Sequence, residues 1–427
     1  MRIGVIAFLI FITGCAPVAH QQLTETFQKT EKKFQDHTGF VIYDPEKDET
    51  VFDYNGAAYF TPASNTKILT LFASLLILGD SIPGIEYLET EDSLIFWGTG
   101  DPSFQYKETF SNNRVLDFLQ QQQKALYFSN SNFHTAHFGS GWAWDDYNSS
   151  YSAERSPFPI YGNCFFVYPF TKDVYVWPWY FKSLLSVGEN QEETKVIRDP
   201  FSNNTMYYPG LRKRKNEWKI PFRVDQQLIT ELLSDTLQRK VQPVMRQKPS
   251  DIKTLYSVPS DSLYKTMMQE SDNLIAEQLL MMCSNVLSDS LQPEIAIKWM
   301  QKNRFEKWPD KVVWVDGSGL SRYNLITPRS VVELWKQIAA VVPRERLFKI
   351  IAVGGKPGTL KNWYIADQPY VFGKTGTLSN THALSGFLVT KSGKTLIFSF
   401  MNANFTASMN EIRHNMQRIL NSFYEKY

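Results

Sequence analysis

Residues 61–79 read TPASNTKILTLFASLLILG, and this stretch is the most informative one for the fold. The run from Ile68 to Leu78 is apolar at almost every position, so it predicts a helix that is buried on all sides. Ser64 and Lys67 lie three residues apart at the start of this helix, where their side chains point the same way. The sequence therefore predicts a serine and a lysine in contact beside a helix N-terminus.

A serine in this place can be a nucleophile. The helix N-terminus adds partial positive charge and free N–H groups beside the Ser64 hydroxyl. A buried lysine near other cations has a lowered pKa, so Lys67 can be neutral and accept the serine proton. The alternative is that both residues merely lie near a helix start, with the lysine in solvent. The pair alone does not decide between the two.

Two further short motifs follow in the chain, Ser-Asp-Asn at 271–273 and Lys-Thr-Gly at 374–376. Each motif alone is weak, because Ser-x-x-Lys recurs at 250–253 and 262–265, and Lys-Ser-Gly occurs at 391–393. The first copy lies in a polar linker, and the second lies too close to the Ser-Asp-Asn motif to face it across a cleft. The third is a hairpin turn between two apolar strands.

The ordered set of three motifs is the signature of serine acyl-transferases of the penicillin-binding protein and β-lactamase superfamily. Beyond these motifs the chain resembles one family, the class C low-molecular-mass penicillin-binding proteins, which are D-alanyl-D-alanine carboxypeptidases and endopeptidases of peptidase family S13. The likeness covers nearly the whole mature chain, and the matching residues lie at 61–67, 100–104, 141–146, 271–277, 316–324 and 373–378. The loop at 354–360 is longer than its family counterpart, and residues 105–253 match only in patches.

The resemblance implies an α+β fold of the penicillin-binding-protein/β-lactamase-like transpeptidase type, a five-stranded antiparallel sheet flanked by helices with a mainly β inserted domain. The sequence pattern predicts strands at 40–44, 51–54, 371–377, 383–390 and 394–401, and helices at 262–269, 274–286, 294–303, 328–341 and 408–427. We expect four segments: a lipoprotein signal peptide at 1–14, a tether at 15–27, a discontinuous catalytic domain at 28–89 and 254–427, and the insertion at 90–253.

The resemblance also implies the roles of the catalytic residues. Ser64 attacks the carbonyl of the D-Ala-D-Ala bond, and Lys67 is the general base. Ser271 relays a proton to the leaving amine, while Asn273 holds Lys67 and the substrate amide. Ser, Asp and Asn all favour helix caps, so the Ser-Asp-Asn motif is expected to be a cap and part of the site together.

The third motif is expected to receive the terminal carboxylate of the substrate. Lys374 supplies positive potential, and the hydroxyls of Thr375 and Thr377 hydrogen-bond the carboxylate along the strand that contains Gly376. The backbone N–H groups of Ser64 and Thr377 are expected to form the oxyanion hole.

Three more residues are assigned by the resemblance alone. Arg322 is expected to meet a charged group on the peptide stem, with a surface ion pair as the alternative. Asp146 and Tyr151 match family positions that approach the far end of the stem. The segment 316–319 reads as a tight turn rather than as part of catalysis.

The N-terminus has the pattern of a targeting segment. Arg2 precedes an apolar run at 3–12 that is too short for a comfortable membrane span. The residues at 12–15 resemble a bacterial lipoprotein cleavage box, in which Cys15 becomes the lipid-carrying N-terminus. We therefore expect a periplasmic protein held to a bacterial membrane by its lipid. The alternative is an ordinary secretory signal with an incidental cysteine.

Composition narrows the function classes. The chain has 427 residues, enough for two or three domains, and its net charge of +2 gives no basic field for nucleic acid. Cys164 and Cys283 can pair or stay as buried thiols. His134 and His137 form a His-x-x-His pair with no further ligand nearby, so neither a metal nor another cofactor is expected.

Two other functions compete with the peptidase. A serine β-lactamase shares the nucleophile, but no segment resembles the loop that carries the deacylating glutamate of class A enzymes. A catalytically silent, peptidoglycan-binding lipoprotein is the second alternative, and the intact motifs weigh against it. The expected partners are peptidoglycan stem peptides and, as covalent inhibitors, β-lactam antibiotics.

Overall fold

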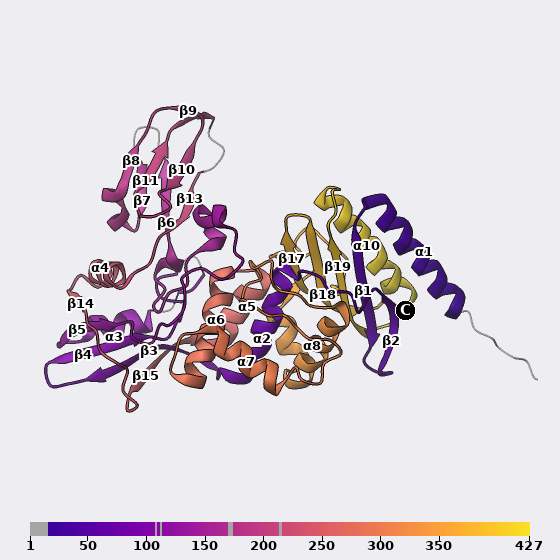
Figure 1. Cartoon of the computed structure of the whole chain (residues 1–427), viewed down its shortest axis with the longest axis horizontal. Coiled ribbons are helices and arrows are strands. Elements are labelled where there is room, and N and C mark those ends of the chain that lie inside the picture. Colours follow the sequence, from indigo (N-terminus) through magenta and orange to yellow (C-terminus); the bar gives the residue numbers. More distant parts are fainter. Residues whose placement is uncertain (1–15, 107–108, 112, 170–173, 213–215) are drawn as a thin grey trace, which may run out of the picture.

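The computed structural model describes residues 16–106, 109–111, 113–169, 174–212 and 216–427. The molecule is elongated, and the N-terminal helix α1 (Ala16–Phe34) lies beside the C-terminal helix α10 (Met409–Lys426) at one end. Figure 1 shows a sheet under these two helices, a group of helices in the middle, and a region made mostly of strands at the far end, part of which projects outward.

The main sheet is antiparallel and joins the two ends of the chain, because β1 pairs with β19. It has six strands rather than the five expected, since a short edge strand pairs with the start of β17. The strands run in the order β16 (Ala352–Val353), β17 (Val371–Leu378), β18 (Thr381–Val389), β19 (Thr395–Ala403), β1 (His37–Asp44) and β2 (Glu49–Tyr54). The fold class implied by the resemblance is therefore confirmed.

Helix α1 corrects the predicted tether at 15–27, since the described part of that segment is helical. Phe27 is fully buried, and its ring lies 5.4 Å from Phe40 and 4.9 Å from Tyr54 between centroids. Leu23 packs against the same hydrophobic cluster. These apolar side chains recur at helical spacing, so they bind the segment to the sheet instead of leaving it free.

The opposite face of the sheet carries the helical lobe. Helix α2 (Thr66–Ile77) follows a 3₁₀ turn, η1 (Ala63–Asn65), and is buried at every residue from Thr66 to Ser74, as its apolar run predicts. The other helices of this lobe are α5 (Ser260–Gln269), α6 (Asn273–Ser288), α7 (Pro293–Asn303), α8 (Pro328–Val341) and α9 (Arg344–Ile350). The helices predicted in this part of the chain are confirmed within two residues at each end.

The inserted region has its own hydrophobic core and several sheets. Its largest sheet contains β3 (Ser81–Glu89), β4 (Ser93–Gly98), β5 (Ala125–Ser129), β14 (Val241–Pro243) and β15 (Lys253–Pro259), with helices α3 (Arg114–Gln121) and α4 (Gln226–Leu237). The projecting part in Figure 1 holds β6 (Cys164–Pro169), β7 (Val174–Trp177), β8 (Leu185–Val187), β9 (Gln191–Glu193), β10 (Lys195–Arg198), β11 (Thr205–Tyr208), β12 (Gly210–Arg212) and β13 (Trp218–Pro221).

The boundaries expected at 90 and 253 cut through this largest sheet, because β3 and β15 pair with each other and belong to it. We propose to place the ends of the insertion at the start of β3 and the end of β15, residues 81 and 259.

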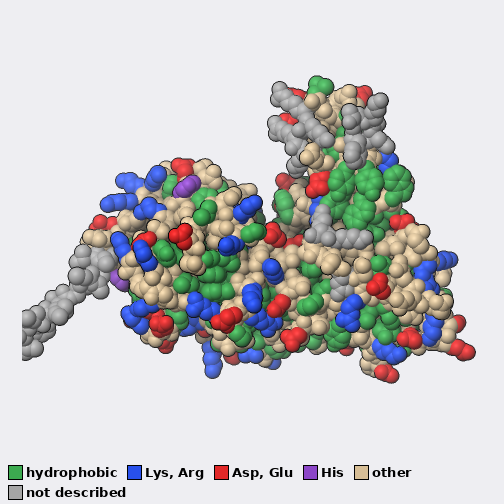
Figure 2. All heavy atoms as spheres, turned by 180° about the vertical axis from the view of Figure 1, so that it is seen from behind, with side chains coloured by type: hydrophobic (Ala, Val, Ile, Leu, Met, Phe, Trp, Pro, Cys, Tyr) green, Lys and Arg blue, Asp and Glu red, His purple; other side chains and the backbone are tan. Residues whose placement is uncertain are grey.

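The surface and the thiols bear on two further expectations. Figure 2 shows Lys and Arg interspersed with Asp and Glu over the face that it displays, without a field of one sign. Cys164 and Cys283 are both buried and do not form the disulfide that was one of the two expectations for this pair. Among the described helices, none combines the length and the apolar character needed to cross a membrane.

Candidate active site

Ser64 lies in the η1 turn, directly before α2, and its side chain is partly exposed. Lys67 lies in the first turn of α2 and is fully buried. The Lys67 Nζ atom lies 3.0 Å from Ser64 Oγ. The two side chains therefore meet as their spacing predicts, with the hydroxyl toward solvent and the amine behind it.

Two more acceptors surround the Lys67 amine. Lys67 Nζ donates to Asn273 Oδ1 at 2.5 Å and to the backbone carbonyl of Ser318 at 2.7 Å. With Ser64 Oγ this makes three oxygen partners, which is the full donor capacity of an ammonium group. The three partners fix the position of the Lys67 nitrogen relative to the Ser64 oxygen.

The charge state of Lys67 is set by opposing effects. Burial lowers its pKa to about 8, because the charged form loses its hydration. Three carboxylates act in the other direction and favour the ammonium: Asp316, Glu277 and Asp272. Lys67 can therefore exchange a proton near physiological pH, which is what a general base requires.

The Ser-Asp-Asn motif starts helix α6. The Asp272 side chain caps the helix by accepting from Ile275 N at 2.8 Å, and it also accepts from the Tyr106 hydroxyl at 2.8 Å. Ser271 precedes the cap in the left-handed region, at φ +63°. The cap therefore turns Ser271 and Asn273 toward Lys67 and Lys374, so the structural and the functional interpretations of this motif hold together.

The Lys-Thr-Gly motif lies on β17, whose edge packs against η1. A Cβ atom on Gly376 would come within 2.5 Å of the Pro62 carbonyl oxygen, so only glycine allows this approach. Asn65 Nδ2 donates to the Lys374 carbonyl at 3.0 Å and ties the turn to the strand. Lys374 Nζ donates to Ser271 Oγ at 2.8 Å, which joins the second and third motifs.

Lys374 differs from Lys67 in its surroundings. It is fully buried, and burial lowers its pKa well below the ordinary value, with the charge of Lys67 adding to the effect. Thr377 is exposed at the end of the motif, where its hydroxyl lies 2.9 Å from His382 Nδ1. Burial and the nearby Arg413 lower the pKa of His382 to about 3, so its ring is neutral.

The residues assigned by resemblance alone fall around the rim of the site. The Tyr151 hydroxyl donates to Asp146 Oδ1 at 2.6 Å, and the Tyr151 carbonyl accepts from Asn273 Nδ2 at 2.8 Å. The Arg322 side chain is exposed, and its backbone N–H donates to Gly141 O at 3.4 Å. Tyr151 thus reaches the centre through its backbone, while Arg322 lies beside the inserted region. Cys15 lies outside the described residues.

The copies of the motifs lie elsewhere. Lys253 belongs to strand β15, and the copy at 262–265 lies on α5 with Lys265 exposed. The Lys-Ser-Gly at 391–393 forms the turn between β18 and β19. The hairpin turn expected at 391–393 is confirmed, whereas the copy at 250–253 reaches from a loop into a strand instead of lying wholly in a linker.

The sequence patterns do not predict the carboxylates near Lys67 or the Ser318 carbonyl that accepts a hydrogen bond from it. Glu277 was available as a signal, because it lies four residues after Asn273 on the same face of a helix that is otherwise mostly apolar. For Asp316 the sequence pattern predicts only a tight turn at 316–319. The Ser318 carbonyl carries no sequence signature, since every residue has a backbone carbonyl.

Comparisons with known proteins agree with this geometry. A family model described as the D-Ala-D-Ala carboxypeptidase 3 (S13) family matches residues 19–423. D-alanyl-D-alanine carboxypeptidase DacB of Haemophilus influenzae is 23% identical over 94% of this chain and 93% of its own length. The crystal structure of penicillin binding protein 4 from Haemophilus influenzae has a TM-score of 0.76 at 21% identity and covers 93% of this chain and 99% of that chain.

A more distant structure is a penicillin G acylated predatory endopeptidase of Bdellovibrio bacteriovorus in complex with an immunity protein. It has a TM-score of 0.51 at 16% identity and covers 90% of this chain and 92% of that chain. The family match confirms the predicted serine peptidase and sets aside the catalytically silent alternative. The chain belongs to the D-Ala-D-Ala carboxypeptidase 3 (S13) family of serine peptidases.

Proposed function

We propose that this chain cleaves the D-Ala-D-Ala bond of peptidoglycan stem peptides through an acyl-enzyme on Ser64, and that β-lactams acylate the same hydroxyl. The observation that carries the proposal is the 3.0 Å contact between Lys67 Nζ and Ser64 Oγ. A buried lysine with a pKa of about 8 beside a partly exposed hydroxyl is the arrangement that activates a serine without histidine.

Acylation begins with proton transfer from Ser64 Oγ to neutral Lys67. The oxygen bonds to the carbonyl carbon of the penultimate D-Ala, and the carbonyl becomes an oxyanion held by the N–H groups of Ser64 and Thr377. The C–N bond then breaks as the proton that Lys67 took from Ser64 passes through Ser271 to the leaving amine, which leaves Lys67 neutral again. The contact with Lys374 Nζ holds the Ser271 hydroxyl within the site.

Deacylation returns the enzyme to its starting state. Water adds to the acyl carbon, its proton passes to the base, and the bond to Ser64 Oγ breaks with return of a proton to that oxygen. Since the leaving amine belongs to a terminal D-Ala or to a cross-linked stem, one bond chemistry serves carboxypeptidase and endopeptidase outcomes. The names of the relatives include both activities.

The terminal carboxylate of the substrate binds along β17. Lys374 contributes the positive potential, Thr375 and Thr377 contribute hydroxyls, and Gly376 lets the strand approach the Ser64 turn. The far end of the stem meets Asp146, Tyr151 and Arg322, and the contact of the Tyr151 carbonyl with Asn273 supports the place of Tyr151 beside the site.

The same proposal places the protein in the periplasm, held to a membrane by lipid on Cys15. The support is the sequence pattern of the first fifteen residues. Replacing Cys15 by Ala is expected to move the protein from the membrane fraction to the soluble fraction of cells. Retention in the membrane fraction would contradict the lipid anchor and leave the catalytic proposal intact.

Intact-mass spectrometry after incubation with benzylpenicillin tests the catalytic proposal. A single stable adduct that maps to Ser64 is expected, together with release of D-Ala from pentapeptides, and both are lost in Ser64→Ala. The matched control is Ser262→Ala, which removes the serine of the copied motif on α5 and is expected to behave as wild type. Labelling that persists in Ser64→Ala would refute the nucleophile, and rapid destruction of penicillin without an adduct would indicate a β-lactamase instead.

A further inference from the structure

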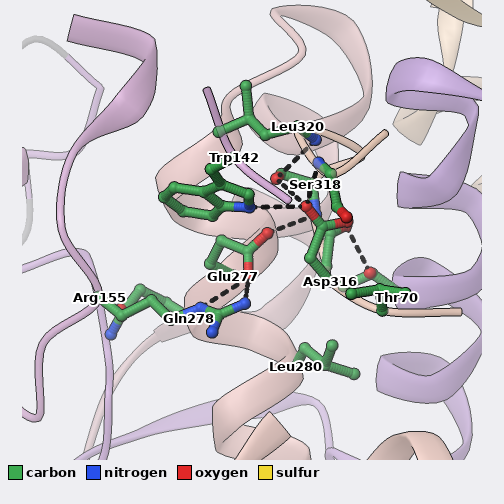
Figure 3. Close-up of polar contacts among 12 residues, drawn as sticks. Thr70, Trp142, Arg155, Glu277, Gln278, Leu280, Asp316, Ser318 and Leu320 are labelled. Carbon is green, nitrogen blue, oxygen red and sulfur yellow. Dashed lines mark hydrogen bonds and ion pairs between the residues drawn. The ribbon is translucent and has the colours of Figure 1, made fainter. Parts of the chain in front are cut away.

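The turn at 317–319 is held between two buried carboxylates and helix α2. Figure 3 shows Glu277 and Asp316 on one side of Ser318, and Thr70 of α2 on the other. Asp316 is fully buried, and Glu277 is 1% exposed. Two acids this deeply buried are costly unless each has partners, so their contacts indicate what they are for.

The first peptide unit of the turn joins Glu277 to α2. The Ser318 N–H donates to Glu277 Oε1 at 2.7 Å. The Gly317 carbonyl, on the other side of the same unit, accepts from Thr70 Oγ1 at 2.7 Å. Thr70 lies one helical turn after Lys67, so this unit fixes the turn to the helix that carries the proposed base.

The second peptide unit joins Asp316 to Lys67. The Gly319 N–H donates to Asp316 Oδ1 at 2.9 Å, and the Ser318 carbonyl accepts from Lys67 Nζ at 2.7 Å. A peptide group carries a dipole of about 3.5 D, and here its negative end faces the amine. One peptide therefore connects a buried carboxylate to the lysine.

The approach of this turn depends on its glycines. Gly319 has φ +83°, and a Cβ atom there would lie 1.9 Å from the Ala63 carbonyl oxygen, in the η1 turn next to Ser64. A Cβ atom on Gly317 would lie 2.5 Å from the Ala276 carbonyl oxygen on α6. The backbone thus fits closely between the nucleophile turn and α6.

The inserted region supplies the outer partners of both acids. The Arg155 guanidinium donates to Glu277 Oε2 through Nε at 2.9 Å and Nη2 at 2.6 Å. Trp142 Nε1 donates to Asp316 Oδ2 at 2.9 Å, and the Arg155 guanidinium lies 5.4 Å from the centre of the Trp142 ring. These two residues connect the insertion to the catalytic lobe beside the active site.

The N–H donors around Asp316 favour its ionised form. Burial and the charge of Glu277 raise its pKa, but every polar group at its oxygens is a donor. Besides Gly319 N and Trp142 Nε1, these donors are Ser321 N at 2.7 Å, Asn324 Nδ2 at 2.7 Å and Ser318 Oγ at 3.4 Å. A proton on either oxygen would face a donor, so the carboxylate is the form that fits.

We propose that Asp316 and Glu277 are positioning residues for Lys67, that they act through the two peptide units of the 317–319 turn, and that Trp142 and Arg155 of the inserted region complete the same device. The inference rests on the proposed role of Lys67 as the base. In this proposal the inserted region helps to position the catalytic lysine, and so does the 316–319 segment, for which the sequence predicts only a turn.

The charges that face Lys67 make the device measurable. The carboxylates are Asp316, Glu277 and Asp272 on the turn and α6, the cation is Lys374 on β17, and His382 on β18 is neutral. Removing a carboxylate weakens the preference for the ammonium, so the pKa of Lys67 falls. Because the base acts when neutral, the rise of acylation with pH then moves to lower pH.

The test uses the purified protein in three variants: Asp316→Asn, Glu277→Gln and Trp142→Phe. The acylation rate constant with benzylpenicillin is measured as a function of pH, beside kcat and KM for a D-Ala-D-Ala peptide. We expect the plateau of acylation and kcat to fall by about 100-fold in the two acid variants, with KM little changed, because a misplaced base costs rate rather than binding. The midpoint of the pH profile is expected to move to lower pH in both.

Trp142→Phe keeps the ring and both acids and removes one hydrogen bond, so it remains informative if an acid variant fails to fold. It is expected to lower kcat with KM little changed. Two matched controls should leave rate and midpoint unchanged. Asp310→Asn removes an acid that pairs with Arg329, and Trp97→Phe removes an indole donor inside the inserted sheet.

The outcomes separate this inference from the proposed function. Folded acid variants with wild-type rates, or with slower rates at an unshifted midpoint, would overturn the positioning role and indicate a purely structural one. A wild-type protein that is not acylated at Ser64 would instead refute the proposed function. If neither acid variant folds, an unchanged kcat in Trp142→Phe overturns the inference.

Discussion

Lys67 and Lys374 are both fully buried within one site, yet the two sides of that site are built differently. The side formed by α6 and the 317–319 turn, which we call the acid side, brings three carboxylates toward Lys67. On the side formed by β17, the strand side, Lys374 donates to the Thr375 carbonyl of its own strand and to the Ser271 hydroxyl from the turn before α6, and it has no carboxylate partner among the described residues. Burial lowers the pKa of both lysines, to about 8 for Lys67 and well below its ordinary value for Lys374.

This difference explains how one site can use one lysine as a base and another as an anion-binding group. On the acid side the carboxylates offset part of the effect of burial on the Lys67 pKa, so Lys67 can gain and lose a proton during turnover. On the strand side Lys374 has no anionic partner among the described residues, and the terminal carboxylate of the substrate is expected to supply one. A terminal carboxylate beside Lys374 raises the pKa of that lysine and favours its charged form, which is the form that binds an anion.

The largest effect is expected on the acid side. Lys67→Ala removes the base, and acylation by benzylpenicillin is expected to slow by about 10³-fold, within the usual range for general-base catalysis. The measurement is the acylation rate constant at fixed pH. Lys265→Ala, which removes the exposed lysine of the copied motif, is the control. An equal loss in both variants would remove the distinction on which the comparison depends.

On the strand side a smaller effect with a different signature is expected. Lys374→Ala should lower kcat/KM for a D-Ala-D-Ala peptide by about 10- to 100-fold, as for loss of a charge-assisted hydrogen bond, and chiefly by raising KM. Steady-state kinetics on the free acid and the C-terminal amide of the same peptide check the cause. If the variant prefers the free acid over the amide as strongly as wild type does, Lys374 does not bind the carboxylate.

Thr377 gives a finer view of the strand side. Thr377→Val keeps the shape and removes the hydroxyl, so kcat/KM for the peptide acid is expected to fall by about 2- to 10-fold, the worth of one neutral hydrogen bond. The peptide amide should lose less. An equal loss for both peptides would assign Thr377 to the structure of the strand end, where its hydroxyl meets His382.

The smallest effects are expected at the rim, away from both lysines. Tyr151→Phe and Asp146→Asn both act on the same hydrogen bond, the one that the Tyr151 hydroxyl donates to Asp146: the first removes it and the second removes the charge of its acceptor. Each variant should slow cleavage of a full stem peptide by about 2- to 5-fold. Acylation by benzylpenicillin should stay at the wild-type rate, because that molecule has no stem. A matching loss with benzylpenicillin would place these residues in the chemistry instead of in substrate selection.

The same two sides explain how much of the site the sequence could predict. Ser64, Lys67 and the Ser-Asp-Asn cap are local patterns on helices, where spacing alone fixes which side chains meet. The carboxylates of the acid side come from the start and first turns of α6 and from the residue before the 317–319 turn. These segments are far from Lys67 in the sequence and approach it only in the folded chain. The Ser318 carbonyl that accepts from Lys67 has no sequence signature, because every residue has a backbone carbonyl.

Two features of the fold could have been predicted better. Leu23, Phe27 and Phe34 recur at helical spacing within and just after the segment expected to be a tether, and that amphipathic pattern predicts α1. The proposed ends of the insertion lie outside those expected at 90 and 253, because β3 and β15 pair although nearly the whole insertion separates them in the sequence. Long-range pairing of that kind cannot be read from local periodicity.

The pH dependence of acylation by benzylpenicillin is the sharpest test of the role of Lys67 as the general base. Lys67 must lose its proton to act as base, so the rate constant of the wild-type protein should rise with pH through a midpoint near the Lys67 pKa of about 8. Lys67→Ala should be slow and should lack this rise. A wild-type rate that is flat from acidic to alkaline pH, or an unchanged rise in Lys67→Ala, would contradict the account.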